Sequence, residues 1–146
     1  MIRVILVLFT SAGMGAFGQD GWQRVSSLVH DGLHDVFFLN DSLGWAYTYG
    51  TGAVIHICDG GQNWEEVQMT QNRLRSIAFI DEKVGFVVGD HNAEDGVLYR
   101  SDEGGLTWEK CKTNYPDLHR LFVAPEKTWI VGKEETILFR NNDNVR

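Results

Sequence analysis

Short runs in which apolar and polar residues alternate cover most of the chain. Three of them begin with a leucine and place apolar residues at alternate positions, over 33–40, 74–81 and 118–124. Second and third apolar runs follow each of these, and in two cases a fourth run begins at Trp64 or Trp108. Because successive side chains of a strand point to opposite faces of a sheet, this pattern predicts strands.

The runs recur with a period in the low forties. Leu33 and Leu74 are 41 positions apart, Leu74 and Leu118 are 44 apart, and Trp64 and Trp108 are also 44 apart. A unit of this length with four short strands has the size of one β-propeller blade. The sequence therefore predicts an all-β fold, a partial β-propeller of about three four-stranded antiparallel blades. The predicted repeats cover about 33–72, 73–115 and 116–142.

Residues 21–29 have the pattern of a fourth, outer strand, whereas the third repeat lacks a fourth strand of its own. We therefore expect 21–29 to be the outer strand of a split blade. Closed propellers have about four to eight blades, more than the three predicted here. Four arrangements remain open: a truncated piece of a longer propeller, an open arc, a compact three-blade unit, and a homodimer that completes a six-bladed ring.

The turn between the third and fourth runs carries the sharpest motif, Asp-x-Gly-x-x-Trp in the first repeat and Glu-x-Gly-x-x-Trp in the second. A short carboxylate can accept hydrogen bonds from the turn's own N–H groups, glycine allows positive φ, and tryptophan fills the gap between strands. Where Glu replaces Asp, we expect either a distorted turn or a substitute role for Asp102. The predicted structural residues are Asp59, Gly61, Trp64, Glu103, Gly105 and Trp108.

These turns and the apolar runs before them resemble the BNR/Asp-box repeats of the photosystem II stability/assembly factor-like propellers, a family with secreted bacterial relatives. The resemblance covers roughly 21–140 and implies a propeller with a non-catalytic role in protein interaction or assembly. Ile57 departs from the pattern, because the family often has Ser or Thr there. The chain also lacks a basic cluster of the kind with which photosynthetic members are said to hold their partner. The resemblance therefore implies a fold and no particular partner.

The first 18 residues have the pattern of a signal peptide. Arg3 supplies a short positive region, an apolar run extends from Val4 to Phe17, and small residues precede Gln19, before which we expect cleavage. This run is about 14 residues long, short for a bilayer span of about 20. We therefore expect 19–146 to be an extracytoplasmic (periplasmic or secreted) propeller with no membrane span after signal cleavage. An uncleaved anchor and a buried first strand are the alternatives.

Acidic residues outnumber basic ones by 20 to 13, which gives a formal net charge of −7. Such a chain repels phosphate backbones, so no nucleic-acid partner is expected. The two cysteines, Cys58 and Cys111, fall at different positions of their repeats, which predicts two buried free thiols. Two cysteines without a Cys-x-x-Cys spacing make no zinc site. We expect no metal and no cofactor.

Enzyme motifs are missing from the sequence. Sialidases also carry Asp-boxes, but they need three arginines that clamp a carboxylate together with a Tyr–Glu pair. The arginines of this chain do not stand in such a context, and no serine lies in a Gly-x-Ser-x-Gly motif. No residue is therefore predicted to be catalytic, and the protein is not expected to be an enzyme.

One recurring position is the candidate binding site. His34, Arg75 and His119 each follow the leucine that opens a repeat. Because the first strand of a blade lines the central axis of a propeller, we expect these side chains at one mouth of the channel. There they would form a small cationic rim for a carboxylate-bearing ligand or a peptide segment; three solvated strand ends are the alternative. Three tyrosines expected to be exposed would add aromatic contacts: Tyr47, Tyr49 and Tyr115.

The sequence thus predicts a non-catalytic extracytoplasmic protein-interaction or assembly module whose protein partner is unknown. Two other functions remain open. One is a binding module for carbohydrate or a surface polymer, which would use aromatic blade faces. The other is a truncated remnant of a longer propeller without a function of its own.

Overall fold

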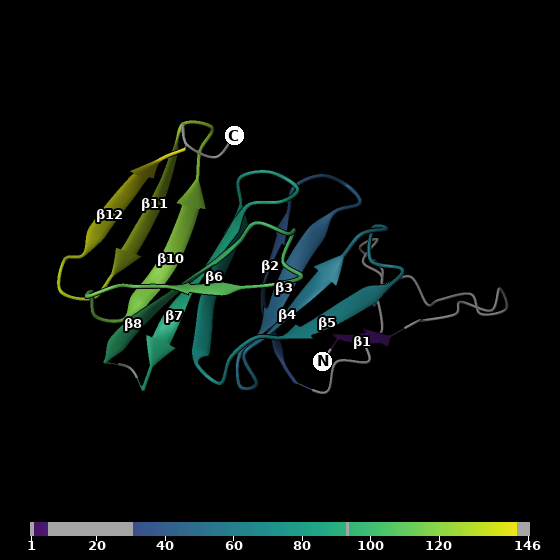
Figure 1. Ribbon diagram of the computed structural model, residues 1–146, viewed down its shortest axis with the longest axis horizontal. Coiled ribbons are helices and arrows are strands. Elements are labelled where there is room, and N and C mark those ends of the chain that lie inside the picture. Colours follow the sequence, from purple (N-terminus) through teal and green to yellow (C-terminus); the bar gives the residue numbers. More distant parts are fainter. Residues whose placement is uncertain (1, 6–30, 93, 143–146) are drawn as a thin grey trace, which may run out of the picture.

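The computed structural model describes residues 2–5, 31–92 and 94–142. These residues form three antiparallel sheets that lie side by side (Figure 1). The first sheet contains β1 (Ile2–Ile5), β2 (Leu33–Phe38), β3 (Gly44–Thr48), β4 (Ala53–Ile57) and β5 (Trp64–Gln68). The second contains β6 (Arg73–Phe79), β7 (Gly85–His91), β8 (Asp95–Ser101) and β9 (Glu109–Cys111). The third contains β10 (Leu118–Val123), β11 (Lys127–Gly132) and β12 (Ile137–Asn141).

The predicted all-β fold of about three antiparallel blades is confirmed. We call β2–β5, β6–β9 and β10–β12 the first, second and third blades. Within each blade, consecutive strands are neighbours in the sheet. The segment 21–29, expected to be the outer strand of a split blade, lies outside the described residues.

β1 adds a fifth strand to the sheet of the first blade. It pairs antiparallel with β5, from Ile2 opposite Val67 to Ile5 opposite Trp64. The uncleaved anchor and the buried first strand stay open as alternatives for the N-terminal segment. The cleavage of a signal peptide stays a prediction.

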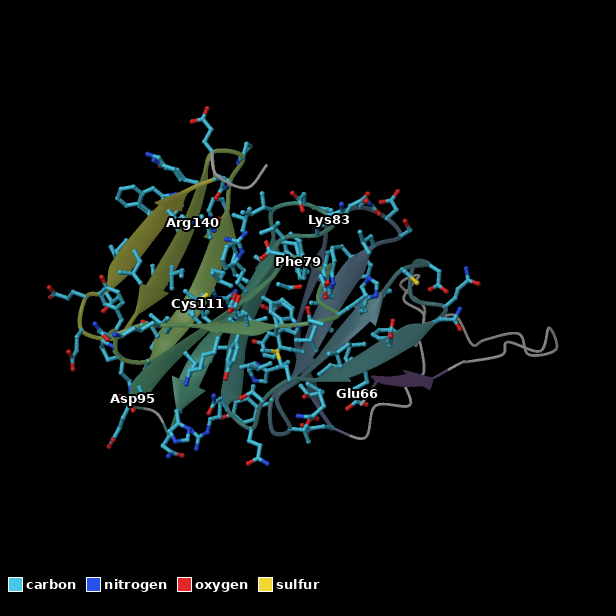
Figure 2. The ribbon with its side chains drawn as sticks, viewed as in Figure 1. Glu66, Phe79, Lys83, Asp95, Cys111 and Arg140 are labelled. Atoms are coloured by element: carbon cyan, nitrogen blue, oxygen red, sulfur yellow. The ribbon has the colours of Figure 1, made fainter. Side chains whose placement is uncertain are left out.

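The first two blades pack through a large apolar core. Trp45, Tyr47 and Val54 of the first blade are buried against Ile77 and Phe79 of the second. The Trp45 ring stacks on Phe79 with 3.5 Å between centroids and 7° between planes. Figure 2 shows the Phe79 side chain in the middle of the stack of sheets. Alternation along the strands thus turns one face of the first blade onto the second.

The second and third blades repeat this arrangement. Phe86 and Val88 of the second blade are buried with Leu121 and Ile130 of the third. The Ser76 hydroxyl accepts the N–H of Leu121 at 3.1 Å inside this interface. The same positions of successive blades therefore build successive interfaces.

Both cysteines are free thiols. Cys58 is exposed, which corrects the expectation that both would be buried, because strand alternation turns its neighbour Ile57 inwards instead. Cys111 is half-buried, and burial raises the pKa of its thiol. Within the described residues we find no helix with the length and apolar character needed to cross a bilayer.

Candidate functional site

Each first strand shifts its pairing with the second strand by one residue at the same place. The shifts lie between Leu33 and Asp35, between Leu74 and Ser76, and between Leu118 and Arg120. The extra residues are His34, Arg75 and His119, the three predicted binding residues. An extra residue of this kind is a β-bulge, which turns a side chain out of the regular ladder. Because β6 lies between β2 and β10, the three bulges are neighbours, and we call these three residues the bulge row.

Two members of the bulge row contact residues at equivalent positions of the second strand. Leu33 pairs with Thr48 and Leu74 pairs with Gly89, and the contacted residues, Tyr49 and Asp90, come directly after those partners. The His34 ring stacks on Tyr49, with 4.8 Å between centroids and 23° between planes. Arg75 Nε lies 2.7 Å from Asp90 Oδ2, and the Asp90 side chain has no exposed surface. The same position in the blade therefore holds an aromatic pair in the first blade and an ion pair in the second.

A buried carboxylate joins the second and third blades at this row. Asp117 Oδ2 lies 3.1 Å from His119 Nε2 and 3.0 Å from Lys133 Nζ, while Asp117 Oδ1 lies 3.1 Å from Arg75 Nε. The Asp117 side chain is 1% exposed. Two members of the bulge row, Arg75 and His119, are thus brought together on one acceptor.

The charges in this network change the expected character of the site. Burial acts to raise the pKa of Asp117, but hydrogen bonds from Lys133 and His119 and the charge of Arg75 outweigh it, and the pKa is lowered. Asp117 is therefore ionised at neutral pH, and with Asp90 it places two buried carboxylates against Arg75. The expected cationic rim is in large part balanced by negative charge.

Two of the three tyrosines are exposed as expected, and one is not. Tyr49 is 44% exposed beside His34, and Tyr115 is 47% exposed after β9. Tyr47 is 1% exposed, because it lies on the same face of β3 as Trp45 and packs against the second blade. Burial, followed by the charge of Asp35, raises the pKa of Tyr47 to about 12. Tyr47 therefore belongs to the core, and its even spacing from Trp45 was the signal in the sequence.

The turn between β4 and β5 is closed by its own side chains. Asp59 Oδ1 accepts the N–H of Asn63 at 2.8 Å, and the Asn63 amide donates to Asp59 Oδ2 at 2.5 Å. The hydrogen bond from the Asn63 N–H is the main cause that lowers the pKa of Asp59. Trp64 Nε1 donates to the Gly61 carbonyl at 2.9 Å, and Gly60 and Gly61 have φ of 71° and 91°.

The turn between β8 and β9 reaches the same shape with other side chains. Ser101 Oγ accepts the N–H groups of Gly105 at 2.8 Å and Glu103 at 3.2 Å. Trp108 Nε1 donates to the Gly105 carbonyl at 2.9 Å, as Trp64 does in the first turn. The Glu103 carboxylate accepts the hydroxyl of Thr107 at 2.6 Å.

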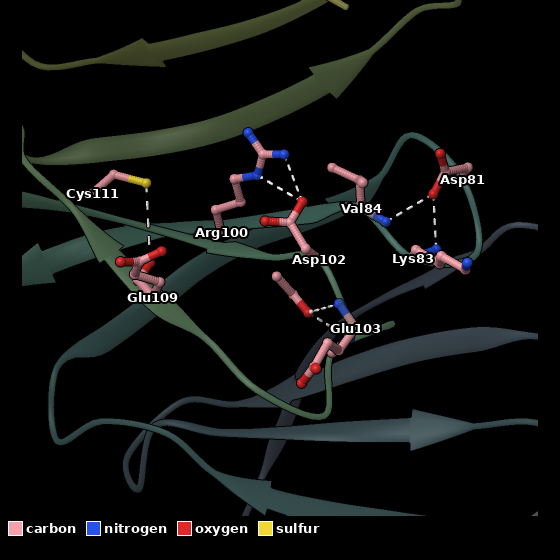
Figure 3. A network of polar contacts seen from close by, with 10 residues as sticks. Asp81, Lys83, Val84, Arg100, Asp102, Glu103, Glu109 and Cys111 are labelled. Atoms are coloured by element: carbon pink, nitrogen blue, oxygen red, sulfur yellow. Dashed lines mark hydrogen bonds and ion pairs between the residues drawn. The ribbon is translucent and has the colours of Figure 1, made fainter. Parts of the chain in front are cut away.

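Neither expected consequence of Glu in place of Asp occurs in this second turn. Asp102 does not take over, because it pairs with Arg100 at 2.5 Å (Figure 3). The turn is not distorted either, since Gly104 and Gly105 have φ of 66° and 87°, close to the values in the first turn. Ser101 supplies the acceptor instead, at the position where the first turn has Ile57.

Asp90, Asp117 and Lys133 contact or neighbour the bulge row but were not among the predicted binding residues. No group of three or more His, Cys, Asp or Glu side chains is placed to hold a metal ion within 2–5, 31–92 and 94–142. The described geometry is that of a polar and aromatic contact surface carried by three adjacent strands.

No protein-family model and no curated protein matches this chain. Solved structures do match it, and two of them are structures of YCF48. One, described as YCF48 bound to D1 peptide, has a TM-score of 0.59 and 18% identity, and the match covers 73% of this chain and 35% of that chain. The other, YCF48 from Cyanidioschyzon merolae, has a TM-score of 0.64 and 17% identity, and the match covers 85% of this chain and 42% of that chain.

This chain therefore spans less than half the length of the YCF48 structures that it matches. At this level of identity the likeness shows the fold. The protein is a partial β-propeller of the architecture found in YCF48, as the resemblance to photosystem II assembly factor-like propellers implied.

Proposed function

We propose that this chain is a non-catalytic protein-interaction or assembly module that works outside the cytoplasm. The observation that carries the proposal is the bulge row, in which three adjacent blades each turn an extra side chain out of the ladder at the same place. A YCF48 structure of the same architecture is described as bound to D1 peptide, which supports a peptide segment as the kind of partner.

The contacts that such a segment would make lie at the two ends of the row. His34 and Tyr49 present a stacked pair of exposed rings, a surface on which an apolar or aromatic side chain can pack. His119 is 40% exposed on its side chain and is held in place by Asp117. Because Arg75 is fixed between two carboxylates, its role in the proposal is to position the row.

The two glycine turns are proposed to be Asp-box turns with a structural role. Their shared indole-to-carbonyl hydrogen bond and their shared pair of positive φ values support this assignment. They close the first and second blades and do not belong to the proposed peptide site.

The first test is a selection of peptides on the full chain. Displayed random 12-residue peptides would be selected on the immobilised protein, and the affinity of the strongest would be measured by calorimetry. We expect His34→Ala and Tyr49→Ala each to weaken binding about tenfold or more, because truncating an aromatic anchor costs more than about 1 kcal/mol.

The control is Leu106→Ala, which removes an exposed apolar side chain from the turn between β8 and β9, away from the starts of the first strands. Its affinity should equal that of the unaltered protein. Arg75→Ala is not a clean variant, because it would remove the ion pair between Arg75 and the buried Asp90. Peptides that bind both ring variants as tightly as the unaltered protein would rule out the bulge row as the contact site.

A second candidate function rests on exposed aromatic rings of the third blade. Phe122 and Phe139 are 66% and 61% exposed, and Trp129 is 36% exposed. Such a surface favours a carbohydrate or surface polymer that stacks on rings. A glycan array tests this candidate: saturable binding that Trp129→Ala abolishes would support it, and the absence of any signal would eliminate it.

We also propose that the protein is exported through its N-terminal segment. The support is the charge and hydropathy pattern around Arg3 and the small residues before Gln19. An extracytoplasmic location would bring the bulge row into contact with envelope or secreted proteins.

A further inference from the structure

The face of the third blade that points away from the second is apolar and exposed. Phe122, Trp129 and Phe139 stand opposite one another across the three strands, and the Trp129 and Phe139 rings lie 5.4 Å apart. Val131 and Ile137 beside them are 41% and 68% exposed. We call these five residues the open face. A contiguous apolar surface of this kind marks an interaction site.

The open face uses the positions that pack each earlier blade onto the next. The last residue of β10, Val123, pairs with Thr128, and Trp129 comes next in β11. Trp45 and Phe86 occupy the same place in the first and second blades. Both of those residues are buried in interfaces between blades. By the same register, Phe122 corresponds to Phe37, which packs against the second blade. The open face is thus half of an interface between blades.

The other half lies on the far side of the first blade. A hollow of about 540 Å³ opens there, and Val36 and Phe38 at its wall are 54% and 46% exposed. Its apolar part is lined by Val36, Phe38, Ala46, Gly60, Gly61 and Trp64, and Leu33, His34 and Asp35 lie at its edge. We call it the receiving hollow.

The contact between the first and second blades shows what the receiving hollow fits. There Trp45 stacks on Phe79 and its Nε1 donates to the Gly104 carbonyl at 2.8 Å. The residues of the first blade that correspond to Phe79 and Gly104 are Phe38 and Gly60, and both line the hollow. The receiving hollow therefore holds the same stacking partner and acceptor, without a tryptophan from a preceding blade within the described residues.

We propose that a second copy of this chain docks head to tail on the first, with the open face of one copy on the receiving hollow of the other. Trp129 of one copy then stacks on Phe38 of the other and donates its indole N–H to the Gly60 carbonyl. Two such contacts close two copies into a ring of six blades, a size that propellers allow. The two halves of the contact lie on one chain, which favours a second copy as the occupant.

The YCF48 fold extends beyond an arc of this size, since the match with one YCF48 structure covers 85% of this chain and 42% of that chain. His34 of the bulge row lies at the edge of the receiving hollow, but the proposed partners of Trp129 are Phe38 and Gly60, and Phe38 lies at the other end of the first strand. The dimer proposal therefore does not rest on the peptide site.

The first experiment measures the mass of the full chain, as isolated from its host, by light scattering and native mass spectrometry. We expect a dimer at micromolar concentration. Trp129→Ala and Val36→Asp, one on each half of the contact, should each raise the dimer dissociation constant at least tenfold. Trp129→Phe should retain part of the affinity, because it keeps the ring and loses the N–H donor. Leu106→Ala, which removes an apolar side chain 38% exposed in the β8–β9 turn, is the matched control and should not change the dimer.

The second experiment identifies the surface. A photoreactive phenylalanine at position 129, mixed with an isotope-labelled second copy, should crosslink between copies to the segment around Phe38 or Gly60. A monomer up to about 100 µM overturns the proposal, as do an open polymer, a dimer that both substitutions leave unchanged, and crosslinks that fall elsewhere. A monomer that still binds selected peptides would leave the proposed function intact, so the two failures are distinguishable. Circular dichroism melting of each variant separates loss of the dimer from loss of the fold.

Discussion

The carboxylate of Asp117 is buried, yet an arginine, a lysine and a histidine reach it from partly exposed positions. Arg75, His119 and Lys133 have side chains 32%, 40% and 47% exposed. Removing one partner of a buried ion pair leaves an uncompensated charge in the interior, which destabilises the folded state by more than the intact pair stabilises it. Asp117 therefore ties the second blade to the third.

Asp117→Asn should destabilise the protein by about 1–3 kcal/mol at pH 7, less than for a fully buried pair because the partners remain accessible to water. The asparagine keeps the size of the side chain and removes its charge. The urea midpoint of unfolding measures the effect. Asp102→Asn is the control, because that carboxylate is 58% exposed and should change the midpoint little.

The stability of the unaltered protein and that of Asp117→Asn should depend differently on pH. The pKa of Asp117 is lowered in the folded state, so its contribution to stability is present above the unfolded pKa of about 3.9 and is lost as the pH falls through the folded value. The difference in unfolding midpoint between the unaltered protein and Asp117→Asn should therefore shrink below about pH 4. A difference that stays constant from pH 7 to pH 2.5 would contradict this assignment.

At the residue scale, the repeat was enough to place His34, Arg75 and His119 at equivalent positions. The repeat could not give the residues that they contact. The equivalent position near the end of the second strand holds Tyr49, Asp90 or Lys133, an aromatic, an acidic and a basic side chain. Asp117 has no counterpart in the other repeats at all. Charge balance in the row therefore depends on contacts between blades, which a single repeat does not contain.

The two glycine turns reach one backbone shape through different acceptors. Asp59 closes the first turn and Ser101 closes the second, while an indole-to-carbonyl bond recurs in both. The second turn also serves its neighbour, because a Cβ on Gly105 would lie 2.9 Å from Trp45 Nε1. The turn is thus an element of the interface between blades as well as a link between two strands.

Gly105→Ala should destabilise the protein by about 2–4 kcal/mol, because it combines positive φ with overpacking against Trp45. Thermal unfolding followed by circular dichroism measures the loss. Gly32→Ala is the matched control, since a Cβ there meets nothing within 4 Å, and its melting temperature should stay close to that of the unaltered protein. Equal melting temperatures for the two variants would show that the Gly105 turn does not limit stability.

Most strands were predictable because alternating apolar residues and glycine turns mark them directly. The pairing of β1 with β5 was not predicted, because a mainly apolar segment such as Ile2–Ile5 suits a signal peptide as well as a strand. Hydropathy alone does not distinguish the two, and the pairing with β5 is a contact between distant parts of the chain.

At the scale of the whole molecule, three blades were predicted from the period of the repeat. Which faces remain open was not evident, because every blade carries apolar residues on both sides. The repeat already aligns Trp45, Phe86 and Trp129 at the start of the second strand of each unit. Only the packing of the blades shows that Trp45 and Phe86 are buried between blades and that Trp129 lies on an exposed face.

Export predicts a defined N-terminus. Protein recovered from the periplasm or medium of its host should begin at Gln19 by N-terminal sequencing and intact mass. A variant with Leu6→Arg, which interrupts the apolar run, should stay in the cytoplasm with its first 18 residues attached. Recovery of the exported protein with Met1 still present would contradict cleavage. In the cleaved protein β5 would lose its partner β1 and become an edge strand.

The bulges separate the part of the chain that must be kept from the part that is free to vary. Each bulge residue is extra to the ladder, so the backbone pairing on either side continues whichever side chain it carries. Arg75 and His119 are tied to buried carboxylates, whereas His34 contacts the exposed ring of Tyr49. His34 can therefore diverge in evolution, or be rewritten by an engineer, without disturbing the core beneath it. A scaffold of this kind can acquire new partners one substitution at a time.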